Sequence, residues 1–185
     1  MDMLGFLEEN QNEWFERIRP YLLSTNLEVG SGLGHFSKLM ESAGIQVTSL
    51  DVIKHPEAIS LRNFVLYDGK EIPFKDASFE ASIAMYVLHH VKERDKLLKE
   101  MKRVSSRRII LVEELYHGWF GKLRLMRLDI WVNFKLRQKS DIHWRSYFDS
   151  DSFEQEVEQG GWKIVHLDRS PRGGFDEVLC ILDRR

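Results

Sequence analysis

The sequence lacks several features that would point to particular classes of protein. It contains a single cysteine, Cys180, so no internal disulfide can form. Because Cys180 lies in an apolar run, we expect a small buried hydrophobic residue rather than a nucleophile. There is no run of 18 or more apolar residues, which argues against a transmembrane helix.

The charged residues show no strong excess of one sign. The formal net charge is -2 at pH 7, whereas nucleic-acid binders usually carry a basic excess, so we expect no nucleic-acid partner. The first residues, Met1-Asp2-Met3-Leu4, lack the basic and then apolar pattern of a secretory signal. Together with the scarcity of cysteine, this indicates a cytoplasmic protein.

The length and composition fit one globular domain. A chain of 185 residues with 43% apolar and 30% charged residues can bury a single core, and we expect one domain over residues 1–185. Residues 1–23 are expected to be an N-terminal helical segment, broken near Pro20. Residues 115–148 are expected to form a helical lid insertion.

Apolar runs alternate with amphipathic helical patterns along the chain. Strands are expected at 27–30, 45–51, 63–67, 80–88 and 109–112, with helices at 36–43 and 93–104. This alternation predicts a parallel sheet covered by helices. Two last apolar runs, 162–167 and 177–182, leave no room for a helix between them and should pair antiparallel. We therefore expect an α/β fold with a Rossmann-like open, mostly parallel seven-stranded sheet, a C-terminal antiparallel hairpin and flanking helices.

A glycine-rich turn follows the first expected strand. Its glycines alternate at Gly30, Gly32 and Gly34, after the acid Glu28. Such a turn places backbone N–H groups at a helix N-terminus, where a ligand can approach closely. A dinucleotide fingerprint needs a third glycine three residues after the second, at position 35 or 37, and neither is glycine. An oxidoreductase using a dinucleotide is therefore disfavoured.

The acid and the alternating glycines resemble motif I of the class I S-adenosylmethionine-dependent methyltransferases, and the likeness continues along the chain. Asp51 resembles the acid that bonds the cofactor ribose, and Asp68-Gly69 with Pro73-Phe74 resembles the adenine-binding stretch. The run from Leu88 to Val91 is similar to that of the small-molecule, type 11-like branch. The resemblance implies S-adenosyl-L-methionine as cofactor and the following cofactor-binding residues: Glu28, Gly30, Ser31, Gly32, Asp51, Val52, Asp68, Gly69 and Met85.

Two segments depart from the family pattern. Only Val52 to Arg62 separate the second and third expected strands, so the usual second helix should be reduced to a turn or lost. The turn before the fifth expected strand is Ser105 to Arg108, where relatives commonly carry Pro-Gly-Gly.

The family pattern identifies no invariant catalytic residue. A base is needed only when the acceptor must lose a proton, and histidine has a suitable pKa for that task. The weak candidates are His90, His117 and His143. Other polar groups expected at the same sheet edge are Tyr86, His89, Glu113, Glu114 and Tyr116. No set of residues shows metal-ligand spacing, so we expect no metal.

The segment 115–148 carries two apolar stripes at helical spacing. One contains Trp119, Leu123, Met126, Ile130 and Phe134, and the other contains Leu125, Leu128, Val132 and Leu136. Seven basic residues against two acidic ones lie between residues 122 and 145. One stripe should pack on the domain. The other could contact substrate, a second copy of the chain in a homodimer, or a membrane surface through residues 117–139, and the basic residues could also simply be solvated.

These features predict an enzyme that transfers the methyl group of S-adenosylmethionine to a small-molecule or lipid-like acceptor by in-line displacement. The alternative is a protein that binds S-adenosylmethionine or S-adenosylhomocysteine without transferase activity, acting as a regulator or partner subunit.

Overall fold

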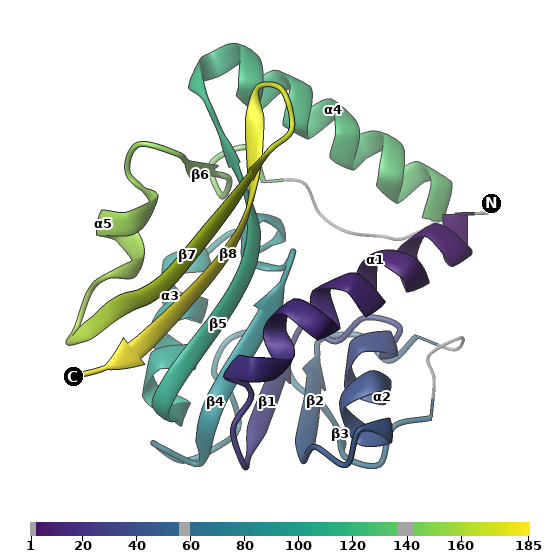
Figure 1. Ribbon diagram of the computed structural model, residues 1–185, viewed down its shortest axis with the longest axis vertical. Coiled ribbons are helices and arrows are strands. Elements are labelled where there is room, and N and C mark those ends of the chain that lie inside the picture. Colours follow the sequence, from purple (N-terminus) through teal and green to yellow (C-terminus); the bar gives the residue numbers. More distant parts are fainter. Residues whose placement is uncertain (1–2, 56–59, 137–142) are drawn as a thin grey trace. The chain divides into compact units, whose positions relative to one another are not determined.

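The computed structural model describes residues 3–55, 60–136 and 143–185 (Figure 1). The contacts divide the chain into two compact units, residues 1–84 with 100–110 and residues 85–99 with 111–185. The expectation of one domain over residues 1–185 stays a prediction. Among the described residues, no helix is both long and apolar enough to cross a membrane.

The sheet has eight strands in the described part of the chain. Seven follow the order β3-β2-β1-β4-β5-β8-β7, and the short β6 pairs with β5. The expected fold class is confirmed, and β6, Phe148–Asp149, is an addition that is too short for a periodic sequence pattern to reveal.

The first unit begins with helix α1, Met3–Ile18, which ends as expected just before Pro20. Strands β1, Asn26–Val29, and β2, Val47–Asp51, are parallel and flank helix α2, His35–Ser42, in the sequence. The ring of Phe15 on α1 packs edge-on against Phe36 on α2, with 6.1 Å between the ring centroids. Every residue of β1 is buried, as expected for a strand with neighbours on both sides.

The rest of the first unit completes the parallel strands. Strand β3, Phe64–Leu66, pairs with β2, and β4, Phe79–Met85, pairs with β1. The described residues between β2 and β3 form no helix; because residues 56–59 lie outside the description, the expectation of a reduced or lost helix stays a prediction. Helix α3, Arg94–Val104, and strand β5, Ser105–Tyr116, each have residues in both units.

The second unit contains helix α4, Gly118–Leu136, helix α5, Phe153–Val157, and the hairpin of β7, Trp162–Pro171, and β8, Phe175–Arg184. The hairpin is antiparallel, as predicted, with a register shift between Ile164 and His166. Cys180 on β8 is fully buried, which raises the pKa of its thiol to about 12 and confirms its role as a core residue.

Helix α4 begins against the tip of this hairpin. Its Gly121 approaches the carbonyl of Gly174 so closely that a Cβ atom at position 121 would lie 2.0 Å from that oxygen. The guanidinium of Arg124 donates to the carbonyl of Gly173, and the His117 N–H donates to Gly174 O at 3.1 Å. Glycine at position 121 is therefore required for the close contact.

Several strand bounds differ from the sequence-based expectation, those of β4 and β5 among them. β4 ends at Met85 rather than Leu88, because Tyr86 has a φ of 55° and turns the chain into a 3₁₀ turn over Leu88–His90. β5 extends well beyond the expected 109–112 and carries Glu113 and Glu114 inside the strand. The apolar residues Val87 and Leu88 extend the strand pattern beyond the true end of β4, whereas polar residues on both sides of 109–112 obscure the true length of β5.

Candidate functional site

The glycine turn lies between β1 and α2, as predicted. Gly30, Gly32 and Gly34 have φ values of 74°, 53° and 80°, which L-residues with side chains rarely adopt. The N–H groups of Gly30 and Ser31 both donate to Leu50 O on β2, at 2.8 and 3.2 Å. The turn is thus tied to the end of the neighbouring strand.

Two groups of this turn fit a ligand. The buried Ser31 hydroxyl has no hydrogen-bond partner within the described part of the chain. A Cβ atom at Gly32 would meet nothing within 4 Å, so the space beside its backbone is open. A buried polar group without a partner is costly, and a ligand atom placed here would satisfy it.

Glu28 is buried and fastens the turn. Its Oε2 accepts a hydrogen bond from the Ser37 hydroxyl on α2, and the Ser37 and Ser49 hydroxyl oxygens lie 2.6 Å apart. Glu28 and Ser49 are also register partners in β1 and β2. Burial, reinforced by the charge of Asp51 and opposed by the Ser37 bond, raises the pKa of Glu28 to about 7. Its observed contacts are thus structural; cofactor contact through Glu28 stays a prediction.

Asp51 lies at the end of β2, where sequence reasoning expected it. Its Oδ2 accepts the Gly32 N–H at 2.7 Å, and its Oδ1 accepts the Ile53 N–H at 3.1 Å. Each carboxylate oxygen can accept a further hydrogen bond. The adjacent Val52 side chain is 50% exposed and offers an apolar surface beside the carboxylate. The arrangement fits a ligand that has both hydroxyl groups and an apolar ring.

Asp68 and Gly69 follow β3 on an exposed loop. The Lys70 N–H donates to Asp68 Oδ1 at 3.0 Å and holds the pKa of that carboxyl below its usual range. Gly69 has a φ of 77°, and a Cβ atom there would lie 3.2 Å from Val52 Cγ1. The loop therefore lies close to the Val52 side chain.

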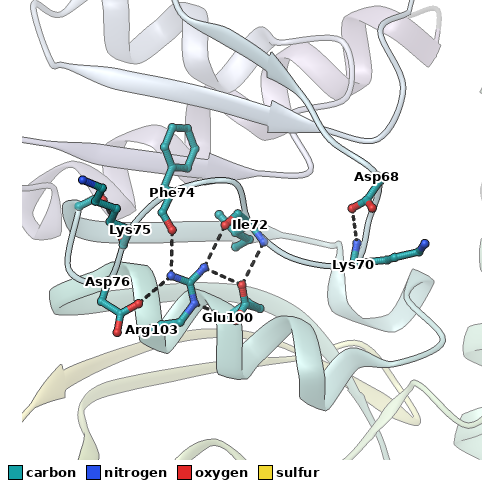
Figure 2. A network of polar contacts seen from close by, with 9 residues as sticks. Asp68, Lys70, Ile72, Phe74, Lys75, Asp76, Glu100 and Arg103 are labelled. Atoms are coloured by element: carbon teal, nitrogen blue, oxygen red, sulfur yellow. Dashed lines mark hydrogen bonds and ion pairs between the residues drawn. The ribbon is translucent and has the colours of Figure 1, made fainter.

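A clamp made by Glu100 and Arg103 at the end of α3 holds this loop (Figure 2). Arg103 donates to the carbonyls of Ile72 and Phe74, at 2.9 and 2.8 Å, and to Asp76 at 2.8 Å. Glu100 accepts from Arg103 at 2.7 Å and from the Ile72 N–H at 3.0 Å. The spacing of Glu100 and Arg103 on one helix face was the only sequence signal for this clamp.

A buried cluster occupies the second unit, beyond the end of β4. Met85, the last residue of β4, is half-buried. His89, which is 2% exposed, places its Nδ1 2.6 Å from Glu113 Oε2 and its Nε2 3.1 Å from His90 Nε2. The imidazole of His89 stacks on the ring of Tyr147, with 5.4 Å between the ring centroids.

Two further acids, Glu114 on β5 and Asp129 on α4, face His89. Ligand atoms of all three residues lie within 4.8 Å of one another, a spacing that a metal ion also requires. Asp129, however, accepts a hydrogen bond from the Tyr147 hydroxyl, and His89 is engaged on both ring nitrogens. Burial and the neighbouring acids raise the pKa of Glu114 to about 8, although the charge of His89 opposes the shift.

The other two candidate histidines are more exposed than this cluster. His117 lies at the start of α4 with its Nε2 3.0 Å from Asp176 Oδ2, and its side chain is 47% exposed. His143 is half-buried, and its carbonyl accepts the Ser146 N–H at 2.8 Å. Of the three candidates, only His90 belongs to the buried cluster.

The two apolar stripes predicted on α4 have different environments. Leu125, on one stripe, is fully buried with Tyr147 and Phe175. Leu128 of the same stripe is 36% exposed. Of the other stripe, Met126 packs against the Leu125 cluster, while the remaining members are solvent-exposed and, with neighbouring aromatic residues, form an apolar surface. We call this surface the aromatic face; it comprises Trp119, Phe120, Leu123, Ile130, Trp131 and Phe134. Because exposed apolar groups of this extent usually mark an interaction surface, the face is a candidate contact site.

Comparisons with known proteins extend this description. A family model described as a methyltransferase domain matches residues 27–111. A demethylmenaquinone methyltransferase of Renibacterium salmoninarum is 30% identical over 167 residues, which cover 80% of this chain and 70% of that protein. A sterol 4-C-methyltransferase of Caenorhabditis elegans is 26% identical over 89 residues, 42% of this chain and 27% of that protein.

A solved structure also resembles the fold. Magnesium protoporphyrin IX methyltransferase from Synechocystis PCC 6803, with bound S-adenosylhomocysteine, gives a TM-score of 0.66 at 14% identity. The match covers 96% of this chain and 83% of that one, and at this identity it shows a common fold.

Proposed function

Because the chain belongs to the S-adenosylmethionine-dependent methyltransferases, we propose that it methylates a small, lipid-like acceptor by in-line displacement. Its cofactor is S-adenosylmethionine, whose sulfonium supplies an activated methyl group. The protein's own contribution is then to bind and orient the two reactants and to manage any proton that leaves the acceptor.

For the cofactor, the first unit supplies the proposed contacts. The unpartnered Ser31 hydroxyl and the open side of Gly32 are the observations that carry this assignment. Asp51 would accept the ribose hydroxyls, while Val52 and the Asp68-Gly69 loop would hold the adenine. Gly30 shapes the turn and Met85 ends β4; their contact with the cofactor, like that of Glu28, is proposed from the family resemblance.

For the acceptor, the aromatic face favours a lipid-like molecule met at a membrane surface. Among the described side chains of α4, the only acid is Asp129, which is 9% exposed, whereas Lys122, Arg124 and Arg127 are basic. Exposed tryptophan and phenylalanine beside basic residues suit an anionic lipid surface. Two relatives are named for quinone and sterol methylation, in keeping with such an acceptor. Residues 137–139 of the predicted contact segment lie outside the description.

Vesicle cosedimentation tests the membrane contact. We expect binding to vesicles containing anionic lipid, and loss of most of it in the double variant Trp131→Ser/Phe134→Ser. Val165→Ser, which removes another exposed apolar side chain, is the matched control and should bind like the wild type. If the double variant binds vesicles as well as the wild type does, the aromatic face does not contact lipid. The same conclusion follows if the two substitutions leave vesicle binding unchanged and only convert a dimer to a monomer.

A methyl-transfer assay tests the acceptor class. The purified protein is given S-adenosylmethionine with either a short-chain demethylmenaquinol in detergent or a panel of water-soluble metabolites. We expect methylated product from the first and none from the second. Tight binding of S-adenosylhomocysteine without methylation of any acceptor would favour the alternative, a cofactor-binding regulator. His117 and His143 stay predicted candidates for a base, to be tested by alanine variants in the same assay.

A further inference from the structure

Three buried side chains of the second unit bring potential metal ligands together. They are His89 in the 3₁₀ turn after β4, Glu114 on β5 and Asp129 on α4. Their ligand atoms lie within 4.8 Å of one another, so small side-chain movements would let all three bind one ion. They are 15 or more positions apart in the sequence, so ligand spacing, on which the expectation of no metal rested, could not reveal them.

Glu114 is the member of this group that lacks a hydrogen-bond donor. It is 9% exposed, and its carboxylate is directed toward His89 and Asp129. Among the residues that the structure describes, none donates a hydrogen bond to this carboxylate. Of the charged groups that act most strongly on it, only His89 can be positive; the others are Asp129, Glu113 and Glu177. A buried carboxylate without a donor or a cation is costly, and a bound cation would satisfy it.

The orientation of His89 is fixed by an outer carboxylate. His89 Nδ1 lies 2.6 Å from Glu113 Oε2, and Glu113 Oε1 already accepts the N–H groups of Val87 and Leu88. Because a carboxylate only accepts, His89 Nδ1 carries the proton, and in the neutral ring Nε2 presents its lone pair. This Nε2 lies 3.8 Å from Asp129 Oδ2. Metal-binding histidines are commonly held by a carboxylate in the same way.

Tyr147 supports the other side of the group. Its hydroxyl donates to Asp129, and its ring stacks on the imidazole of His89. Carboxylates that bind a metal are usually held by such an outer hydrogen bond. His90 Nε2 lies 3.1 Å from His89 Nε2, so this contact must break when an ion takes the lone pair of His89. A role of His90 as a base stays a prediction.

We propose that His89, Glu114 and Asp129 bind a divalent transition-metal ion, for which Zn²⁺ is the best fit. One imidazole and two carboxylates form a donor set that zinc accepts, and three protein ligands leave a position open for water. Mg²⁺ and Ca²⁺ prefer sites made of oxygen ligands alone. The ion joins α4 to β5 and to the 3₁₀ turn within one unit of the chain. This site is independent of the proposed methyl transfer.

Zinc binding to the metal-free protein tests the site. The full chain is treated with a chelator and dialysed against Zn²⁺, and the bound metal is counted by elemental mass spectrometry. We expect one ion per chain and a rise in Tm. Glu114→Gln should lose both, because it keeps the size of the side chain but removes a ligand. The substitution breaks no described hydrogen bond, so the metal-free variant should be at least as stable as the wild type. If it does not fold, Asp129→Asn provides the same test.

Two further variants locate the ion. Glu113→Gln changes only the outer partner of His89 and should weaken Zn²⁺ binding by about 10- to 100-fold. His117→Asn is the matched control, because it removes a histidine that lies 3.0 Å from Asp176 elsewhere in the second unit. It should bind Zn²⁺ like the wild type. Nitrogen-15 NMR should show zinc shifting the His89 Nε2 resonance while Nδ1 stays protonated.

Three results would overturn the site. They are the absence of stoichiometric Zn²⁺ binding by the wild type, unchanged binding in Glu114→Gln, and loss of binding in His117→Asn. Mg²⁺ that binds more tightly than Zn²⁺ would contradict the proposed class of metal, because an imidazole ligand favours zinc.

Discussion

At the scale of single residues, Asp51 links the glycine turn to β2. Its carboxylate accepts the Gly32 N–H at 2.7 Å and keeps acceptor capacity for ligand hydroxyls. Asp51→Asn preserves the shape but replaces one of the two acceptor oxygens by a donor. We expect S-adenosylhomocysteine to bind about 10- to 100-fold more weakly, the loss of one or two charge-assisted hydrogen bonds. Calorimetry measures the change, and Asp95→Asn, whose side chain is 87% exposed, is the control.

Glu28 makes the stability of the protein depend on pH in an unusual direction for an acid. Its pKa is raised from 4.5 to about 7, so the folded state holds a proton that the unfolded state has lost. The stability from this proton is complete below pH 4.5 and is lost as the pH rises through 7. In Glu28→Gln this loss is absent. The unfolding free energy of the wild type should therefore fall relative to that of Glu28→Gln as the pH rises from about 4 to about 8. The change in this difference should be on the order of 2–3 kcal/mol. If urea titrations give the same pH dependence of unfolding free energy for the wild type and Glu28→Gln, Glu28 does not have a raised pKa in the folded state.

At the scale of elements, the Arg103 clamp joins the end of α3 to the loop that carries Asp68 and Gly69. Arg103→Met removes donors to two backbone carbonyls that have no other described side-chain donor, so the loop should loosen. We expect a loss of about 1–3 kcal/mol of unfolding free energy and weaker binding of S-adenosylhomocysteine. Lys99→Met, an exposed lysine of the same helix, should change neither. Hydrogen exchange at the Ile72 amide gives a local measurement, and unchanged protection in Arg103→Met would show that the clamp does not hold the loop.

Helix α4 is attached to the hairpin through a glycine. In an ordinary helix interior, alanine in place of glycine adds up to about 1 kcal/mol of stability. At position 121 the added Cβ would lie 2.0 Å from Gly174 O, so Gly121→Ala should instead destabilise the protein and lower its Tm. The sign of the change is decisive, because a stabilised variant would mean that α4 does not pack on the hairpin tip as described.

At the scale of the whole molecule, the sequence predicted what depends on local patterns. The order of strands and helices, the glycine turn, Asp51 at the end of β2 and the C-terminal hairpin all follow from periodicity and turn residues. The Arg103 clamp and the Glu113–His89 pair could not be predicted in this way. Each joins residues more than 20 positions apart, and only the pairing of strands and the path of loops brings them together.

The surface of α4 also could not be predicted from local sequence patterns alone. Its sequence carries two apolar stripes, but which of their residues are buried depends on the partners that they meet, as Leu125 meets Tyr147 and Phe175. The aromatic face, with the basic side chains beside it, is the basis for proposing a lipid-like acceptor. The aromatic face lies in the second unit, while the proposed cofactor residues lie in the first, apart from Met85.

The most direct test of the proposed function is transfer of a labelled methyl group from S-adenosylmethionine into a lipid extract, followed by mass spectrometry of the organic and aqueous fractions. We expect labelled product in the organic fraction with the wild type, and much less with Asp51→Asn at limiting cofactor. Label only in water-soluble products, or no transfer by a protein that binds S-adenosylhomocysteine, would contradict it.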